Sequence, residues 1–291
     1  MATPTKGKAP APKASTKARR RTTTPKKKQQ EKVVREVRNM PVWVRNLLAL
    51  CIVLVFSAGF YYFFIRPYAY RWKPCYGLKG YGVCMPCDYE VHGIDISHYQ
   101  GGIDWRQLAQ THAGEFPIRF IFMKATEGGD HRDDTFRQHF DSAYKYNFIR
   151  GAYHFFRPHT DARKQADFFI RNVKLLPGDL PPVLDVEDRG KRSKEEFQQA
   201  VKTWLDDVEA HYGVKPILYT SYKFKMRHLD NPVFDAYPYW IAHYYVDSVR
   251  YKGRWHFWQH TDVGTVPGVE EEVDLDVFNG TLEQLDSLRL R

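Results

Sequence analysis

The uncharged run from Leu47 to Ile65 constrains this chain more than any other feature of its sequence. It contains 19 residues, and a helix of that length, rising about 1.5 Å per residue, spans the hydrocarbon core of a bilayer. Trp43 precedes the run. Aromatic residues also follow or close it, as in the aromatic belts of membrane interfaces: Tyr61, Tyr62, Tyr68, Tyr70 and Trp72. The sequence therefore predicts one transmembrane helix, with the rest of the chain divided between the two sides of a membrane.

The charge distribution predicts the orientation of that helix. Residues 1–87 hold 18 of the 44 Lys and Arg residues but only 2 of the 34 acidic ones. Basic residues crowded before a span favour a cytoplasmic N-terminus. A cleaved signal peptide is the alternative, but its apolar region would be shorter, and no small-x-small site follows Ile65 cleanly. We expect a type II single-pass membrane protein whose large C-terminal domain lies in the periplasm or at the cell surface.

Composition divides the chain into four parts. We expect a disordered basic cytoplasmic tail (1–41), a transmembrane signal-anchor helix (42–66), a cysteine-containing stalk (67–90) and a folded domain (91–291). One disulfide from Cys75 to Cys84 or Cys87 would staple the stalk, and the sequence leaves the pairing open. The chain after residue 87 carries 26 basic and 32 acidic residues, so a nucleic-acid partner is not expected.

Short apolar runs alternate with amphipathic stretches from Val91 onward, which favours a parallel sheet with helices outside. The eight expected strands are 91–96, 120–125, 151–155, 182–186, 216–219, 239–242, 256–259 and 273–277. The expected helices are 104–109, 134–146, 161–172 and 193–212. Eight strands in about 200 residues predict an irregular α/β barrel, with weaker helices in its last third.

The strand at 182–186 ends in two carboxylates, Asp185 and Glu187. Side chains at i and i+2 of a strand point to the same face, so these two acids project together. Two adjacent carboxylates do not easily both ionise, and one is pushed towards holding a proton. A glycosidase needs such a pair, with one acid to protonate the leaving oxygen and one anion beside the developing cation.

Further acids lie on other strands or just after them. Asp95 lies on the first strand, Glu127 follows the second, and Asp274 and Asp276 share a face of the last. In barrels of this class the chemistry lies at the carboxyl ends of the strands, so these acids are expected to converge. Aromatic side chains that could stack on sugar rings accompany them: Tyr99, Tyr153, Tyr219, Trp240, Tyr244 and Trp258. His154, which alternates with Tyr153 and Phe155, is expected to be structural.

These motifs together resemble glycoside hydrolase family 25, the Chalaropsis-type lysozymes. The resemblance rests on five motifs in order: His92 to Ser97, Phe122 to Gly128, Gly151 to Phe155, Pro182 to Glu187, and Val273-Asp274. It implies a flattened, irregular (β/α)8-like barrel that cleaves the β-1,4 bond between N-acetylmuramic acid and N-acetylglucosamine in peptidoglycan. It also implies catalytic roles for Glu187 as general acid/base and Asp185 as its partner, with Asp95 and Asp274 as flanking acids. No metal or cofactor is implied.

The substrate contacts expected beside these acids are Tyr153, Tyr219, Trp240, Trp258, Tyr99 and Glu127. The nucleophile stays open between a second carboxylate and the N-acetyl carbonyl of the substrate, and Asp276 competes with Asp274 for one position. The expected partners are peptidoglycan strands and, through one helix, the membrane, with no obligate protein partner. Two other functions fit the same groove: a non-catalytic peptidoglycan-binding module, or a hydrolase of another N-acetylated glycan such as chitin.

Overall fold

The computed structural model describes residues 29, 34–36, 38–66, 77–86 and 88–291, which fall in two compact units, residues 1–73 and 74–291. In the first unit, helix α2 (Val42–Phe60) continues as a π-helical segment, η1 (Tyr61–Ile65). Within the described residues, 42–65 is the one helix long and apolar enough to cross a membrane. Most of the expected basic tail, residues 1–28, lies outside the described residues.

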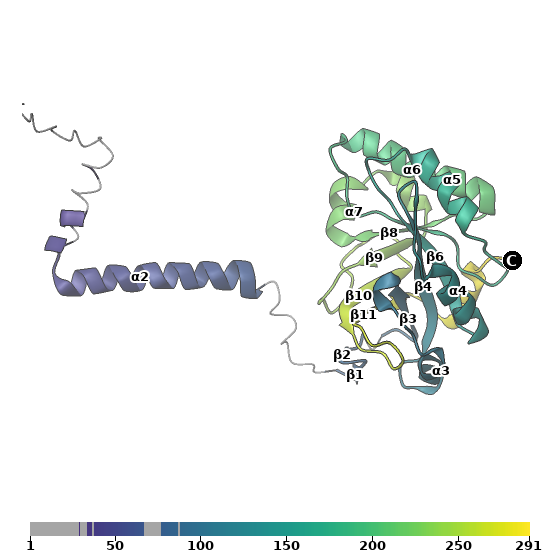
Figure 1. Cartoon of the computed structure of the whole chain (residues 1–291), viewed down its shortest axis with the longest axis horizontal. Coiled ribbons are helices and arrows are strands. Elements are labelled where there is room, and N and C mark those ends of the chain that lie inside the picture. The colour runs from purple at the N-terminus through teal and green to yellow at the C-terminus, as the bar shows by residue number, and fades with distance from the viewer. Residues whose placement is uncertain (1–28, 30–33, 37, 67–76, 87) are drawn as a thin grey trace, which may run out of the picture. The chain divides into compact units, whose positions relative to one another are not determined.

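The second unit is a closed barrel with helices around it (Figure 1). Its eight strands are β3 (Val91–Ile96), β4 (Ile118–Glu127), β6 (Ile149–Phe155), β7 (Val183–Asp185), β8 (Ile217–Ser221), β9 (Tyr239–Ala242), β10 (Phe257–Gly264) and β11 (Val273–Phe278). They pair in chain order, and the pairing of β11 with β3 closes the barrel. A short strand, β5 (His131–Arg132), adds to the end of β4. The expected eight-stranded barrel is confirmed.

One strand departs from the expected parallel arrangement. From β3 through β10 each strand is parallel to the next one around the barrel, whereas β11 is antiparallel to both β10 and β3. A parallel return needs a crossover of a dozen or more residues. Only residues 265–272 separate β10 from β11, so the chain turns back directly. The start of β11 therefore lies at the rim where the other strands end.

The four expected helices are present as α3 (Trp105–Ala109), α4 (Phe136–Lys145), α5 (Ala162–Asn172) and α6 (Lys194–Tyr212). Ser193 and Glu196 form a capping box at the start of α6, and Gly213 ends it with φ of 71°, a left-handed conformation that glycine adopts easily. Two helices were not expected, α7 (Tyr222–His228) and α8 (Leu282–Leu288). Each has 7 residues, too few for a clear helical period. The described part of this unit also contains three 3-10 turns: η3 (His98–Gln100), η4 (Gln110–Ala113) and η5 (Pro232–Ala236).

Alternation along the strands produces two apolar layers. One fills the barrel and includes Phe120, Phe122 and Phe257, while the other lies between the strands and the helices. Two glycines make room for the inner rings. A Cβ on Gly93 would lie 2.3 Å from the Phe120 ring, and one on Gly151 would lie 2.4 Å from the Phe122 ring. The packed interior confines the polar site to one end of the barrel.

The described end of the segment expected as a stalk packs on the barrel unit. Strands β1 (Lys79–Gly80) and β2 (Val83–Cys84) form a hairpin. At its turn the Tyr81 hydroxyl donates to the Phe116 carbonyl at 2.6 Å, and the Thr265 amide donates to the Tyr81 carbonyl at 2.8 Å. Cys84 is in a disulfide bond. Cys75, its expected partner, and Cys87, the alternative partner of Cys75, both lie outside the described residues.

Candidate active site

A pocket of about 240 Å³ opens at the rim where β11 starts and the other barrel strands end. Most of its polar and aromatic lining comes from different strands of the barrel or the loops after them. The lining residues are Asp95, Ile96, Ser97, Tyr99, Gln100, Lys124, Tyr153, Phe155, Asp185, Glu187, Tyr219, Trp240, Tyr244, Gln259 and Asp274. The structure thus brings together all four acids expected to be catalytic.

Asp185 and Glu187 face the pocket together, as their spacing predicts. Strand β7 ends at Asp185, and the intervening Val186 packs in the outer apolar layer with Leu184. Burial raises the pKa of Asp185 well above its usual value, and the neighbouring Glu187 charge adds to the effect. Glu187 is more exposed than Asp185, yet partial burial also raises its pKa. Both shifts favour the protonated form, so the pair is arranged to share a proton.

Two further acids meet across the β3–β11 pairing. Asp95 is the register partner of Asp274. Burial raises the pKa of both carboxyls, to about 9 for Asp274, where the Asp95 charge adds to it. Asp95 also accepts a hydrogen bond at 2.6 Å from the Gln259 side-chain amide. These acids tend towards the protonated form, in which they can donate hydrogen bonds to a ligand.

Gln259 on β10 links several walls of the pocket. Its Nε2 donates to Asp95, while its Oε1 accepts from the hydroxyls of Tyr219, at 2.7 Å, and Tyr244, at 2.5 Å. The sequence interpretation did not include this residue. Its position in the sequence could have indicated it. Gln259 comes two residues after Phe257, whose ring lies inside the barrel, and period-2 alternation places both on the same inward face.

The structure separates Asp274 from Asp276, which the sequence left as alternatives. Both face inward, but only Asp274 lines the pocket. Asp276 lies two residues further along β11 and is fully buried, where its Oδ1 accepts a hydrogen bond at 2.8 Å from Trp240 Nε1. Burial and the Asp274 charge raise the pKa of Asp276 well above its usual value. Asp276 therefore lies beneath the pocket.

The aromatic residues expected to bind substrate divide into two groups. Tyr99, Tyr153, Tyr219 and Trp240 line the pocket. Trp258 does not: it is 1% exposed, and its Nε1 donates to the His243 carbonyl at 2.8 Å. Strand alternation is the reason, because Trp258 lies between the inward-facing Phe257 and Gln259 and so points away from the pocket.

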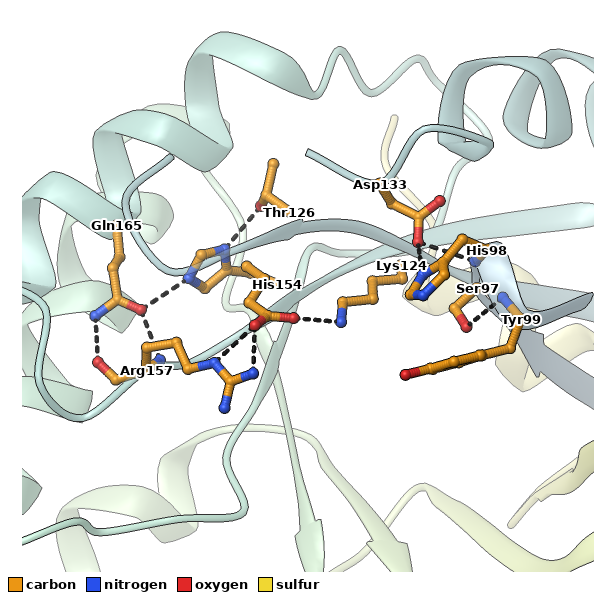
Figure 2. A network of polar contacts seen from close by, with 10 residues as sticks. Ser97, His98, Tyr99, Lys124, Thr126, Asp133, His154, Arg157 and Gln165 are labelled. Atoms are coloured by element: carbon orange, nitrogen blue, oxygen red, sulfur yellow. Dashed lines mark hydrogen bonds and ion pairs between the residues drawn. The ribbon is translucent and has the colours of Figure 1, made fainter. Parts of the chain in front are cut away.

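Tyr99 differs from the other pocket aromatics because 73% of it is exposed. Its ring lies 4.1 Å from the His98 ring, measured between centroids. Asp133 holds His98 by accepting from its backbone amide at 2.9 Å and by contacting its Nδ1 at the same distance (Figure 2). Tyr99 is thus an exposed aromatic ring on a supported turn at the edge of the pocket.

Glu127 does not line the pocket. Its carboxylate instead forms ion pairs with Lys124 and Arg157. His154 is fully buried, as expected for a structural residue: its Nδ1 contacts the Thr126 hydroxyl at 2.7 Å and its Nε2 contacts Gln165 at 3.2 Å (Figure 2). Burial lowers the pKa of His154 to about 4, so it stays neutral near neutral pH.

A model of the family described as glycosyl hydrolases family 25 matches residues 94–269, more than half of the chain. The chain belongs to glycosyl hydrolase family 25. It is therefore a glycoside hydrolase. The matched range contains Asp95, Asp185 and Glu187, and Asp274 follows it by a few residues.

Relatives and solved structures of family 25 agree with this assignment. The protein YegX of Escherichia coli K12 is 40% identical over 225 residues, covering 77% of this chain and 80% of YegX. Lysozyme M1 of Streptomyces globisporus is 34% identical and covers 68% of this chain and 71% of the relative. A solved family 25 glycosyl hydrolase from Bacillus anthracis has a TM-score of 0.64 at 32% identity, covering 70% of this chain and 95% of that structure.

No group of three or more His, Cys, Asp or Glu side chains is arranged to hold a metal ion among the residues that the structure describes. The acids that line the pocket come from several strands, and Gln259 and two tyrosine hydroxyls form hydrogen bonds between the walls of the pocket. The chemistry that these residues offer is proton transfer and stabilisation of positive charge, which is the chemistry of glycoside hydrolysis.

Proposed function

We propose that the barrel is a muramidase that cleaves the β-1,4 bond between N-acetylmuramic acid and N-acetylglucosamine in peptidoglycan. The observation that carries this proposal is the Asp185–Glu187 pair in a pocket with aromatic walls, in a chain of family 25. The similarity to a protein named lysozyme supports the same substrate.

Glu187 is the general acid/base in this proposal. Burial raises its pKa, which favours the protonated form that a leaving oxygen needs, and its exposure allows a glycan to reach it. Asp185 is its partner. Asp185 Oδ1 is buried without a hydrogen-bond partner among the described residues, and such an orphaned acceptor is costly unless a ligand satisfies it. The N–H of a substrate acetamido group is a donor of the right kind.

The nucleophile in this proposal is the N-acetyl carbonyl of the substrate. A protein carboxylate has to be ionised to attack, and burial raises the pKa of both Asp95 and Asp274, to about 9 for Asp274, which disfavours the ionised form of these flanking acids. With the single proton of the pair on Glu187, Asp185 is the anion that orients the acetamido group and stabilises the positive charge that develops on it. Asp95 and Asp274 bind the sugar from the opposite wall.

The proposed sugar contacts are Tyr99, Tyr153, Tyr219 and Trp240, which present ring faces or hydroxyls to the pocket. Glu127 and Trp258, expected as contacts from the sequence, are left out of this set because neither lines the pocket.

The proposal places the barrel outside the cytoplasmic membrane of a bacterium. Helix α2 with η1 would act as a signal anchor, supported by its length and its apolar composition. The basic residues before it support a cytoplasmic N-terminus, with the barrel in the periplasm or at the cell surface. A tether of this kind would direct the enzyme to the peptidoglycan next to its own membrane.

Product analysis tests the activity. Purified peptidoglycan is digested with the protein, the new reducing ends are reduced with borohydride, and the reduced sugar is identified. Muramitol is expected. Glucosaminitol would identify a glucosaminidase, release from chitin in place of peptidoglycan would identify a different glycan substrate, and binding without any release would leave a non-catalytic module.

A further inference from the structure

The acidic pocket contains one cation whose role the muramidase assignment does not explain. Four acids line the pocket, and among its described lining residues Lys124 is the one Lys or Arg side chain. Lys124 is buried, with 9% exposure. A buried ammonium is retained only where charges compensate it, so its surroundings should reveal what it does.

A bulge in β4 positions this lysine. The pairing of β4 with β6 shifts register between Lys124 and Thr126, so one extra residue is accommodated in β4. In a regular strand, residues three apart point to opposite faces. The extra residue of the bulge places Lys124 and Glu127 on the same face of β4. Lys124 Nζ therefore donates to Glu127 Oε2 at 2.5 Å.

Phe155 and Arg157 complete the support around Lys124. Lys124 Nζ lies 4.9 Å from the centre of the Phe155 ring, and the Arg157 guanidinium carbon lies 4.6 Å from the same centre. Arg157 Nε donates to Glu127 Oε1 at 2.7 Å, so Lys124 and Arg157, both labelled in Figure 2, hold the Glu127 carboxylate between them. Lys124 is therefore fixed in one place at the edge of the acid pair.

We propose that Lys124 is a positioning residue whose charge, held in place by Glu127 and Phe155, sets the pH range in which the Asp185–Glu187 pair keeps a single proton. The inference rests on the proposed acid/base role of that pair. Glu127, which was expected from the sequence to contact the sugar, instead restrains Lys124 in this proposal.

Lys124 and Glu127 are expected to shift the pKa of Asp185 in opposite directions. Burial is the main cause that raises the pKa of Asp185 and of Glu187, and the Lys124 charge lowers both. The Glu127 charge raises the pKa of Asp185. The other groups whose charge or hydrogen bonding bears on the pair include Asp95 on β3, Tyr153 on β6, Tyr219 on β8, Asp274 on β11 and Arg157 after β6. Because these groups are present in every variant below, differences between the pH–rate profiles of the variants report on Lys124 and Glu127.

The experiment compares pH–rate profiles of the full-length protein with those of K124M, K124R and E127Q on soluble peptidoglycan fragments. In K124M both limbs are expected to move to higher pH by about one unit, the usual scale for loss of a nearby opposite charge. K124R keeps the charge and is expected to keep the wild-type limbs. E127Q is expected to move the acidic limb to lower pH, the direction opposite to K124M.

Each outcome decides the inference. A K124M profile that falls at every pH with unmoved limbs would mean that Lys124 only supports the local structure, and the inference would be wrong. Should K124M fail to fold or be too slow to profile, K124Q, which also removes the charge but keeps a polar side chain, is profiled in its place, and unmoved limbs there also overturn the inference. An inactive wild-type protein would instead contradict the muramidase activity itself.

Discussion

Asp274 at the start of β11 lies directly across the sheet from Asp95 near the end of β3, as register partners in an antiparallel pair. Two acids from opposite ends of the domain sequence therefore share one wall of the pocket. This juxtaposition depends on the reversed direction of β11. Had β11 been parallel to its neighbours, its first residues would lie at the other end of the barrel.

Replacement of the proposed acid should abolish lysis without unfolding the barrel. In E187Q the amide has the shape of the carboxyl but delivers no proton, and general acid catalysis typically contributes about 10²–10⁴-fold. The lysis rate of purified cell walls should fall by that factor, while the thermal melting temperature stays near the wild-type value. A folded E187Q with near-wild-type lysis would remove Glu187 from the acid role.

Asp274 should make the barrel less stable as the pH rises. Its pKa is raised to about 9 from an ordinary value of 3.8, so the folded state binds this proton more tightly than the unfolded chain does. The stability it contributes is thus complete below its ordinary pKa and is lost as the pH rises towards 9. D274N does not titrate, and its free energy of unfolding relative to wild type should increase from pH 4 to pH 9. Urea unfolding at several pH values measures this, and a difference independent of pH would contradict it.

Tyr99 should affect substrate binding more than the chemical step. The Tyr99 ring is exposed at the pocket edge and is not part of the core. Y99A should therefore raise KM several-fold, while kcat changes little and the melting temperature stays the same. Tyr144 is 63% exposed and does not line the pocket, so Y144A is the matched control. Equal KM values for the two variants would argue against a sugar contact at Tyr99.

The buried ion pair between Arg150 and Asp179 should support the fold and not the chemistry. Arg150 Nε donates to Asp179 Oδ1 at 2.6 Å, and the same carboxylate accepts from the Leu176 amide at 2.7 Å. D179N leaves the guanidinium without its counter-charge, and breaking a buried pair in this way costs about 3–5 kcal/mol. Chemical denaturation should show that loss, with kcat unchanged at temperatures where the variant is folded. A loss below about 1 kcal/mol would contradict the prediction.

The proposed membrane topology predicts the behaviour of C-terminal reporters. A reporter that is active only in oxidising compartments, fused after Arg291, should be active in bacteria because the basic residues before Leu47 hold the N-terminus in the cytoplasm. The same fusion to a chain lacking residues 1–66 is the control and should be inactive. Activity only from a reporter that works in the cytoplasm would reverse the topology, and a mature chain starting after Ile65 would indicate a cleaved signal.

Local pattern was enough to predict much of this protein. Period-2 alternation placed Asp185 and Glu187 on one face, and both line the pocket. Helix signals were equally direct: Ser193, Glu196 and Gly213 marked the ends of α6. These features depend on neighbours within a few residues, so they are readable before any long-range contact is known.

Longer-range features required the folded barrel. The depth of a residue along a strand separates Asp274 in the pocket from Asp276 beneath it, although both point inward. Gln259 faces the pocket and Trp258 faces away from it, because the pairing of β10 with β9 and β11 decides which of its two faces points into the barrel. Spacing within one strand gives the alternation of side chains, but it gives neither the depth of Asp274 nor which face of β10 points into the barrel.

The sequence by itself determined the eight strands, the main helices, the family and the acid pair, because hydrophobic period and motif spacing are local properties. Only the tertiary structure decided the direction of β11, the pairing of Asp95 with Asp274 and the position of Lys124 beside the acids. Those depend on how the barrel closes and where β4 bulges. Closure and bulge are set by packing among all the strands at once, which is the physical reason that no single segment of sequence specifies them.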